Sequence, residues 1–327
     1  MIGSSAISIA VLAGSLWAGV TEAQSLQWVE PTLLSLPSVR CCGAMAYDPQ
    51  MHASLLFGGG NGGIYPAVRY NDTWTFSREN RWSQLSPATI PPARQGAGMA
   101  YDPTTGTVVM FGGCPGWDTT MNDTWVWDGV NWTQEFPAVS PPARTFQTQG
   151  MAYDPLTETV VMFGGGLGDT WIWNGRRKTW TQQFPAASPP PSNPSIAYDP
   201  AHGNVVLFGG ADSQGVDLNQ TWTWNGETWT QQSPLTSPSP RGLPSMAYDS
   251  SIGALVLFGG SAGPPSALND TWIWNGITWA QLQTTHTPEG RWAASMDFDP
   301  MIGLVLFGGE LAGDPFTDQT WLFVAAP

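Results

Sequence analysis

At 327 residues the chain is long enough for one large domain or two ordinary ones, so length alone excludes little. The 19 tryptophans need a repeated structural role, because few surfaces carry so much exposed indole, and they accompany 38 Gly, 29 Pro and only 11% charged residues. A net charge of −14 excludes general nucleic-acid binding, which needs a basic surface, and also disfavours anionic membranes.

The N-terminal segment has the pattern of an export signal. Residues 7–20 are apolar, and Thr21-Glu22-Ala23 followed by Gln24 fits a cleavage site, although no Lys or Arg precedes the apolar run. The alternative is a membrane anchor, but an anchor needs about 20 apolar residues and this run is shorter. We therefore predict a signal peptide over residues 1–23, a secreted protein (extracellular or periplasmic), and no membrane insertion after cleavage.

A pattern of about 50 residues then recurs six times, a period typical of propellers and solenoids. Each copy has an Ala-Tyr-Asp-Pro-like segment, an apolar run ending in Phe-Gly-Gly, a Thr-Trp pair and, in all but the last copy, a later Trp. The first aromatic is Tyr47, Tyr101, Tyr153, Tyr198, Tyr248 and Phe298. The Thr-Trp tryptophans are Trp74, Trp125, Trp171, Trp222, Trp272 and Trp321, and the later ones are Trp82, Trp132, Trp180, Trp229 and Trp279.

Each copy predicts four short strands, which we name a to d in chain order. Strand a leads to the tyrosine, and an Asp-Pro-x-x-Gly turn, as at residues 102–106, follows it. Strand b is continuously apolar, as at residues 205–208, which indicates burial on both faces. Strand c is the Thr-Trp-x-Trp stretch, and an Asn-Gly or Asp-Gly hairpin leads into strand d. Four strands per unit of this length predict propeller blades.

The sixth copy ends after its strand c, at residues 321–324, and lacks a strand d. Residues 26–29, directly after the proposed cleavage site, have the missing pattern, and pairing them with the last copy closes the ring and removes its open edges. The predicted fold is an all-β, six-bladed β-propeller with four antiparallel strands per blade over residues 24–327. The blade units are residues 37–86, 87–136, 137–184, 185–233, 234–283, and 284–327 together with 24–36.

These motifs resemble those of the kelch-repeat superfamily, which includes the propeller domain of galactose oxidase. The Gly-Gly after strand b, the aromatic strand c and the later Trp carry the resemblance across residues 24–327. The resemblance implies the fold, but a fold that hosts many functions implies no activity.

Five arginines occupy one repeat position at the start of strand a, where they are expected to ring one mouth of the central channel. They are Arg40, Arg94, Arg144, Arg241 and Arg291. The resemblance implies a binding face, because kelch proteins that bind acidic peptides line it with arginines at this place, and the guanidinium fork suits carboxylates. The alternative is that carboxylates of the repeat, such as Asp72, Asp123 or Asp270, neutralise each arginine.

Other aromatic side chains fall outside the repeat pattern, in the d–a and b–c loops that should share this face. They are Tyr65, Trp117, Trp292 and Phe316, and the acids Asp118 and Glu310 lie in the same loops. Exposed aromatics beside arginine fit a sugar or peptide ligand, whereas the alternative is that they pack within the loops. We take these residues, with the five arginines, as the candidate ligand-binding set.

The cysteines and histidines predict no metal site and no cofactor. Cys41, Cys42 and Cys114 match no zinc spacing, but they should approach the same mouth, so Cys114 is a candidate to form a disulfide with Cys41 or Cys42. The histidines are His52, His202 and His286, and the first two fall on the opposite face from the third. Copper chemistry like that of galactose oxidase is therefore not expected.

Three functions remain open from the sequence. The first is a non-catalytic binding module for an acidic peptide, a protein or a carbohydrate at the arginine-ringed face. The second is a sugar-acid mutarotase, since the resemblance extends to six-bladed kelch mutarotases of sialic acid, and such chemistry requires an acid or base beside an arginine clamp. The third is a structural or assembly propeller.

Overall fold

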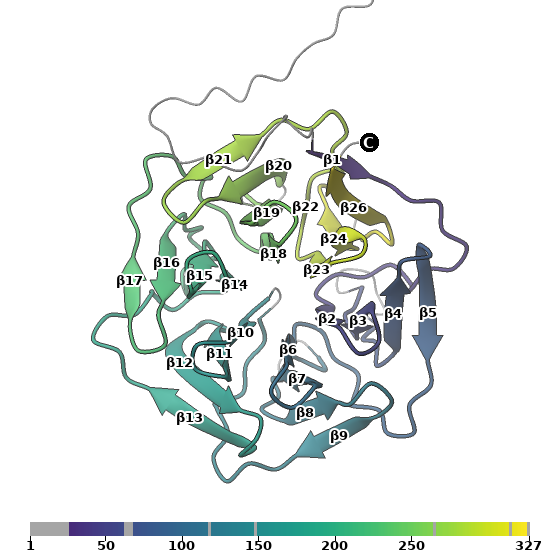
Figure 1. The fold of residues 1–327 in the computed structure, drawn as a ribbon, viewed down its shortest axis with the longest axis vertical. Coiled ribbons are helices and arrows are strands. Elements are labelled where there is room, and N and C mark those ends of the chain that lie inside the picture. Colours follow the sequence, from purple (N-terminus) through teal and green to yellow (C-terminus); the bar gives the residue numbers. More distant parts are fainter. Residues whose placement is uncertain are drawn as a thin grey trace, which may run out of the picture.

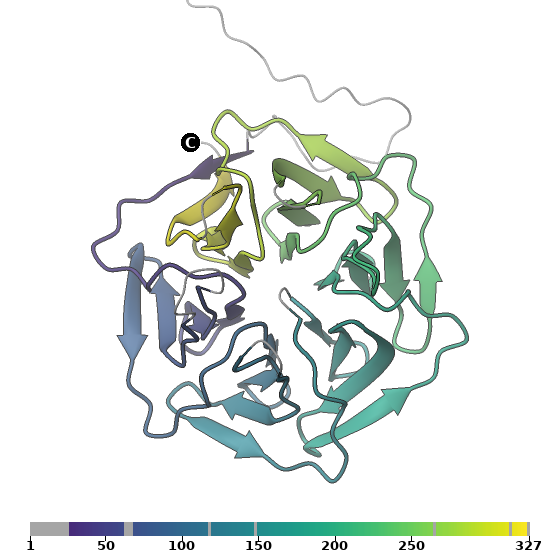
Figure 2. The same ribbon diagram turned by 180° about the vertical axis from the view of Figure 1, so that it is seen from behind.

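The computed structural model describes residues 26–61, 68–116, 119–146, 149–263, 266–313 and 316–325. These residues form six four-stranded antiparallel sheets around one central axis (Figure 1), and the opposite view in Figure 2 shows the same closed ring. The prediction of an all-β, six-bladed propeller is confirmed. The proposed signal peptide, residues 1–23, lies outside the described residues.

In every blade, strand a lies nearest the axis and strand d forms the outer edge (Figure 1). Strands a are β2 (Ala44–Asp48), β6 (Gly98–Asp102), β10 (Met151–Asp154), β14 (Ser195–Asp199), β18 (Ser245–Asp249) and β23 (Ser295–Asp299). Strands b are β3 (Ala53–Phe57), β7 (Thr107–Phe111), β11 (Thr159–Gly164), β15 (Asn204–Phe208), β19 (Ala254–Ser261) and β24 (Gly303–Phe307). Strands c are β4 (Thr73–Ser77), β8 (Thr124–Trp127), β12 (Leu167–Asn174), β16 (Thr221–Trp224), β20 (Ala267–Trp274) and β26 (Thr320–Ala325). Strands d are β5 (Arg81–Leu85), β9 (Trp132–Glu135), β13 (Thr179–Gln183), β17 (Trp229–Gln231), β21 (Trp279–Leu282) and β1 (Leu26–Val29).

The turn between strands a and b follows from its sequence. After β6, Asp102 Oδ1 accepts a hydrogen bond of 2.9 Å from the backbone N–H of Thr104, and Gly106 takes the left-handed conformation with φ of 69°. A side-chain carboxylate that caps its own turn, followed by glycine, is a common way to reverse a chain in few residues. The strand that follows, β7, is buried along almost its whole length, as its apolar sequence predicts.

The N-terminal strand completes the last blade. Strand β1 pairs antiparallel with β26, with Trp28 opposite Phe323, and the sheet order is β1-β26-β24-β23. This confirms the predicted closure, in which chain segments about 300 residues apart form one sheet and β1 covers the edge of β26 that would otherwise be unpaired.

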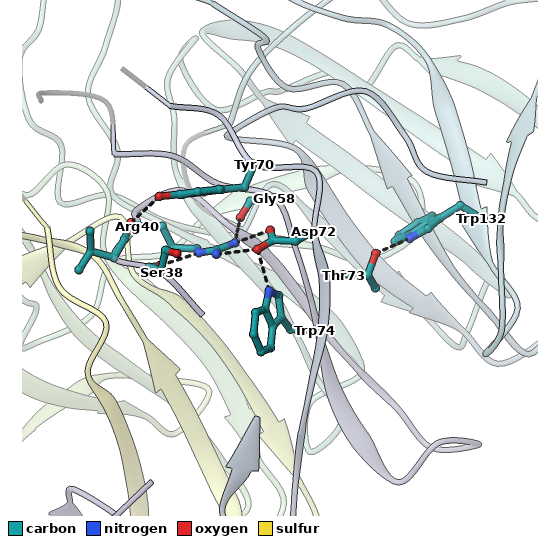
Figure 3. Close-up of polar contacts among 9 residues, drawn as sticks. Ser38, Arg40, Gly58, Tyr70, Asp72, Thr73, Trp74 and Trp132 are labelled. Atoms are coloured by element: carbon teal, nitrogen blue, oxygen red, sulfur yellow. Dashed lines mark hydrogen bonds and ion pairs between the residues drawn. The ribbon is translucent and has the colours of Figure 1, made fainter. Parts of the chain in front are cut away.

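A ring of tryptophans joins each blade to its neighbour. The indole N–H of each strand-d tryptophan donates to the threonine of the Thr-Trp pair in strand c of the preceding blade, at 2.8–3.0 Å, as Trp132 does to Thr73 in Figure 3. The pairs are Trp28–Thr271, Trp82–Thr320, Trp132–Thr73, Trp180–Thr124, Trp229–Thr170 and Trp279–Thr221. Each indole also packs against the last phenylalanine of the preceding strand b, as Trp132 does on Phe57 with ring centroids 5.2 Å apart. The tryptophan content is therefore a property of the fold.

One small element was not predicted. Strands β22 (Arg291–Trp292) and β25 (Glu310–Leu311) form a separate two-stranded sheet between the d–a and b–c loops of the sixth blade. Within the described ranges, no helix is long and apolar enough to cross a membrane.

Candidate functional site

The repeat arginines are buried and paired. Arg40 donates from Nη1 and Nη2 to the two carboxylate oxygens of Asp72, at 2.7 and 2.8 Å, and from Nη1 also to the carbonyl oxygen of Gly58 (Figure 3). Its Nε donates to the carbonyl oxygen of Ser38, and the guanidinium carbon lies 4.1 Å from the centre of the Tyr70 ring. Planar bidentate pairing of this kind is the strongest form of the arginine–carboxylate contact.

The same arrangement recurs in three further blades. The pairs are Arg94–Asp123, Arg144–Asp169 and Arg241–Asp270. In all four blades the aspartate also accepts the indole N–H of the tryptophan two residues later, at 2.7 Å. Each unit therefore ties the d–a loop, the end of strand b and the start of strand c together, which is a structural task.

The carboxylates show the electrostatic effect of this pairing. Burial by itself would raise the pKa of Asp123, but the hydrogen bonds and charge of Arg94, with the indole of Trp125, bring that pKa below its ordinary value. The pKa of Asp169 and that of Asp270 are lowered for the same reasons.

Two blades depart from the pattern. In the sixth blade Arg291 donates to the amide oxygen of Gln319, and burial without a facing carboxylate lowers the pKa of Arg291 to about 10. In the fourth blade Ser192 stands at the arginine position and Gln220 at the aspartate position, where it accepts the indole N–H of Trp222.

These contacts match the neutralisation alternative for the arginines. All five side chains are at most 1% exposed, and Nε and both terminal nitrogens of each arginine donate to protein oxygens. A ligand carboxylate would have to displace a built-in partner to reach them. The prediction that Arg40, Arg94, Arg144, Arg241 and Arg291 bind a ligand directly therefore has no support from their geometry.

The structure describes three of the six aromatic and acidic candidates on this face. Trp292 and Glu310 lie opposite each other on β22 and β25, and the Trp292 indole N–H donates to Glu310 Oε2 at 3.1 Å. Phe316 packs beside Trp292 against Cys41 and Cys42, and all three candidates remain partly exposed. Burial raises the pKa of Glu310, and the Trp292 hydrogen bond partly offsets this. Tyr65, Trp117 and Asp118 lie outside the described residues.

The three cysteines are buried free thiols, and Cys41 and Cys42 pack beneath this patch. Cys41 Sγ and Cys42 Sγ are 2.8 Å apart, and the contact with Cys41, followed by burial, raises the pKa of Cys42 well above its usual range. The disulfide from Cys114 stays a prediction. The raised pKa of Cys42 keeps its thiol protonated at neutral pH, which makes Cys42 a weak nucleophile.

A cavity lies on the propeller axis, and its principal acid was not singled out from the sequence. The cavity has a volume of about 270 Å³, and the repeat aromatics line it: Tyr47, Tyr101, Tyr153, Tyr198, Tyr248 and Phe298. At the residue before each aromatic, five blades have alanine and the sixth has Asp297. The signal was present in the sequence, as Asp-Phe-Asp where the other copies have Ala-Tyr-Asp.

Asp297 is the only carboxylate among the described residues that line this cavity. Burial raises its pKa to about 7, although the backbone N–H groups of Phe298 and Tyr47 hydrogen-bond to it and act in the opposite direction, and Asp299 adds to the increase. The packed neighbours β2 and β18 contribute Tyr47, Asp48, Tyr248 and Asp249, none of which is a cation.

The pH dependence of stability should reveal this acid. A carboxyl whose pKa is about 7 when folded and 3.8 when unfolded weakens the folded state as pH rises through this window, because the unfolded chain ionises first. We expect the free energy of unfolding of Asp297→Ala, relative to that of the native protein, to increase by about 2 kcal/mol as the pH rises from roughly 5 to 8. Urea unfolding at the two pH values measures this gain. Equal pH profiles for both proteins would contradict it.

The described residues thus define a six-bladed β-propeller with an aromatic–acid patch at one mouth and an aromatic cavity on its axis. No protein-family profile and no curated protein matches the chain. His202 hydrogen-bonds Asp199 in an a–b turn and His286 lies in a d–a loop, so these two histidines fall on opposite faces, as predicted.

Proposed function

We propose that this chain is a secreted, kelch-type binding module that recognises carbohydrate at the patch formed by Trp292, Glu310 and Phe316. The observation that carries the proposal is the cross-strand pair of Trp292 and Glu310. A partly exposed indole offers a flat apolar surface to a sugar ring, and a neighbouring carboxylate accepts hydrogen bonds from sugar hydroxyls.

Carbohydrate is favoured over an acidic peptide by charge. Four of the five arginines of the face have their charge balanced by an aspartate, the fifth faces an amide, and the chain carries a net charge of −14. An acidic peptide would also meet Glu310. A sugar-acid mutarotase needs an arginine able to hold the sugar carboxylate, and the repeat arginines are already engaged.

A glycan array followed by calorimetric titration tests the proposal. We expect Trp292→Ala to weaken glycan binding by about thirtyfold or more, since central aromatic contacts contribute about 2 kcal/mol. Glu310→Gln keeps an acceptor and should weaken binding less. Phe184→Ala, which removes an aromatic that is 84% exposed after β13, is the matched control and should bind as the native protein does.

Thermal unfolding of each variant separates loss of binding from loss of fold. Glycan binding that survives both Trp292→Ala and Glu310→Gln would overturn the proposed patch. Binding of acidic peptides with no response to glycans would instead favour the peptide alternative.

A further inference from the structure

The lining of the axial cavity differs in one blade from the pattern of the other five. Aromatic and small side chains from all six blades surround it, and a single carboxylate interrupts them. Its volume of about 270 Å³ is far larger than the space one water molecule needs. It lies at the tyrosine end of strands a, near the a–b turns, and so away from the patch of Trp292 and Glu310.

Asp297 has no counter-charge. At the position where five blades have alanine, its carboxylate accepts a hydrogen bond from the backbone N–H of Tyr47 in the neighbouring blade. None of the ion pairs found in the described ranges involves it, and the cavity lining contains no Lys, Arg or His. A partly buried carboxylate without a cationic partner weakens the fold, which makes Asp297 a candidate for a functional group.

The surroundings of Asp297 favour a positive ligand. Each of the five tyrosines lies near the a–b turn aspartate of the preceding blade, and burial followed by these charges raises the pKa of every one of them. The phenols therefore stay neutral and the local potential is negative. Aromatic rings that surround a site of negative potential are a recurring way to hold an organic ammonium group.

At the opposite end of the channel, backbone hydrogen bonds link neighbouring blades to one another. The N–H of Cys42 donates to Ala293, that of Gly96 to Cys42, that of Phe146 to Gly96, and that of Ala293 to Leu243, at 2.7–3.0 Å. These bonds link five neighbouring blades at the start of strand a. Gln149, directly before β10, also lines the cavity, and its side chain donates to the carbonyl oxygen of Met99 in the second blade. A ligand would therefore enter from the a–b turn face.

We propose that the axial cavity is a second binding site, which takes a small organic cation whose ammonium group pairs with Asp297 between the tyrosines. Its chemistry and its place differ from those of the carbohydrate patch. The two sites can therefore be lost independently.

Choline is the probe, and its uncharged isostere, in which a tert-butyl group replaces the trimethylammonium, is the control ligand. By calorimetry at about pH 8, where Asp297 is ionised, we expect choline to bind and the isostere to bind at least about tenfold more weakly. Asp297→Ala installs the residue that five blades already contain, so the fold should persist while choline binding falls by about tenfold or more. Glu227→Ala removes an exposed carboxylate from the hairpin between β16 and β17 and should bind choline as the native protein does.

Lowering the pH to about 5 should weaken choline binding by the native protein, because protonation removes the charge of Asp297. Equal binding of choline and its isostere, unchanged binding by Asp297→Ala, or no binding of choline at millimolar concentration would each overturn the proposal. Glycan binding by Asp297→Ala should equal that of the native protein, which keeps this test separate from that of the patch.

Discussion

Replacing Asp123 with alanine is expected to lower the free energy of unfolding by about 3–5 kcal/mol. The change removes both acceptors of the Arg94 fork and the acceptor of the Trp125 indole, and it leaves a guanidinium that is at most 1% exposed without its counter-charge. Urea unfolding followed by tryptophan fluorescence measures the loss. A loss below about 1 kcal/mol would mean that the pair contributes no more than an exposed ion pair does.

The fourth blade supplies the control for this experiment. It has Ser192 and Gln220 in place of the arginine and the aspartate, so this part of the fold tolerates the absence of both charges. We expect the double variant Arg94→Ser with Asp123→Gln to be less destabilised than the sum of its two single variants. Removing both members of a buried pair leaves no isolated charge, whereas each single change leaves one. Additive losses would contradict this coupling.

Acid should weaken the native protein at the same pairs. The pKa of Asp123, Asp169 and Asp270 is lowered in the folded state, so each carboxylate contributes stability above its unfolded pKa of 3.8. That contribution is lost as pH falls through the lower, folded pKa. The pairs are therefore at full strength at neutral pH.

The fold was predictable because the same local pattern occurs six times. One Asp-Pro-x-x-Gly turn or one Thr-Trp pair carries little information, but six copies at a regular spacing leave few architectures, and the incomplete last copy identifies β1 as the closing strand. The small sheet of β22 and β25 could not be predicted in this way. The same loops meet in other blades only as single bridges, such as Cys41–Gly60 and Gln95–Cys114, and the repeat motifs do not show how far each pairing extends.

The pairing of the arginines with aspartates could also be predicted from the sequence, because the two positions vary together between blades. Four blades have both the arginine and the aspartate before Thr-Trp, and the blade without the arginine has Gln220 instead of the aspartate. Such joint variation favours pairing over ligand binding. The sixth blade is an exception to the correlation, because it has Arg291 but Gln319 in place of the aspartate. The distance between the two positions depends on how the loops fold, which spacing along the chain does not give.

For Asp297 the sequence shows the residue that differs between blades but not where its side chain lies. Its departure from the repeat was visible, but the sequence does not say whether the residue before the tyrosine faces a neighbouring blade, solvent or the axis. Closure of the ring decides this, because strand a becomes the channel wall only when all six blades are in place.

Substitutions in the closing strand β1 should reduce the stability of the protein more than substitutions elsewhere. Trp28 is 1% exposed, lies between Phe258 and Phe323, and donates to Thr271 of the fifth blade at 3.0 Å. We expect Trp28→Ala to lower the free energy of unfolding by about 3–5 kcal/mol, because it removes a large buried side chain at the seam. Val29→Ala, on the exposed face of the same strand, is the matched control and should change stability by less than about 1 kcal/mol.

The hydrogen bond of Trp28 can be separated from its packing. Trp28→Phe keeps an aromatic ring but leaves the buried Thr271 hydroxyl without its donor, which should cost about 1–3 kcal/mol. Adding Thr271→Val removes that orphaned hydroxyl and should restore part of the loss. Because the other five blades contain the same pair, Trp132→Phe with Thr73→Val should behave alike. A much larger loss of stability at Trp28 than at Trp132 would mean that the seam, where β1 pairs with β26, limits the stability of the whole ring. A much smaller loss at Trp28 would mean that β1 does not close the ring.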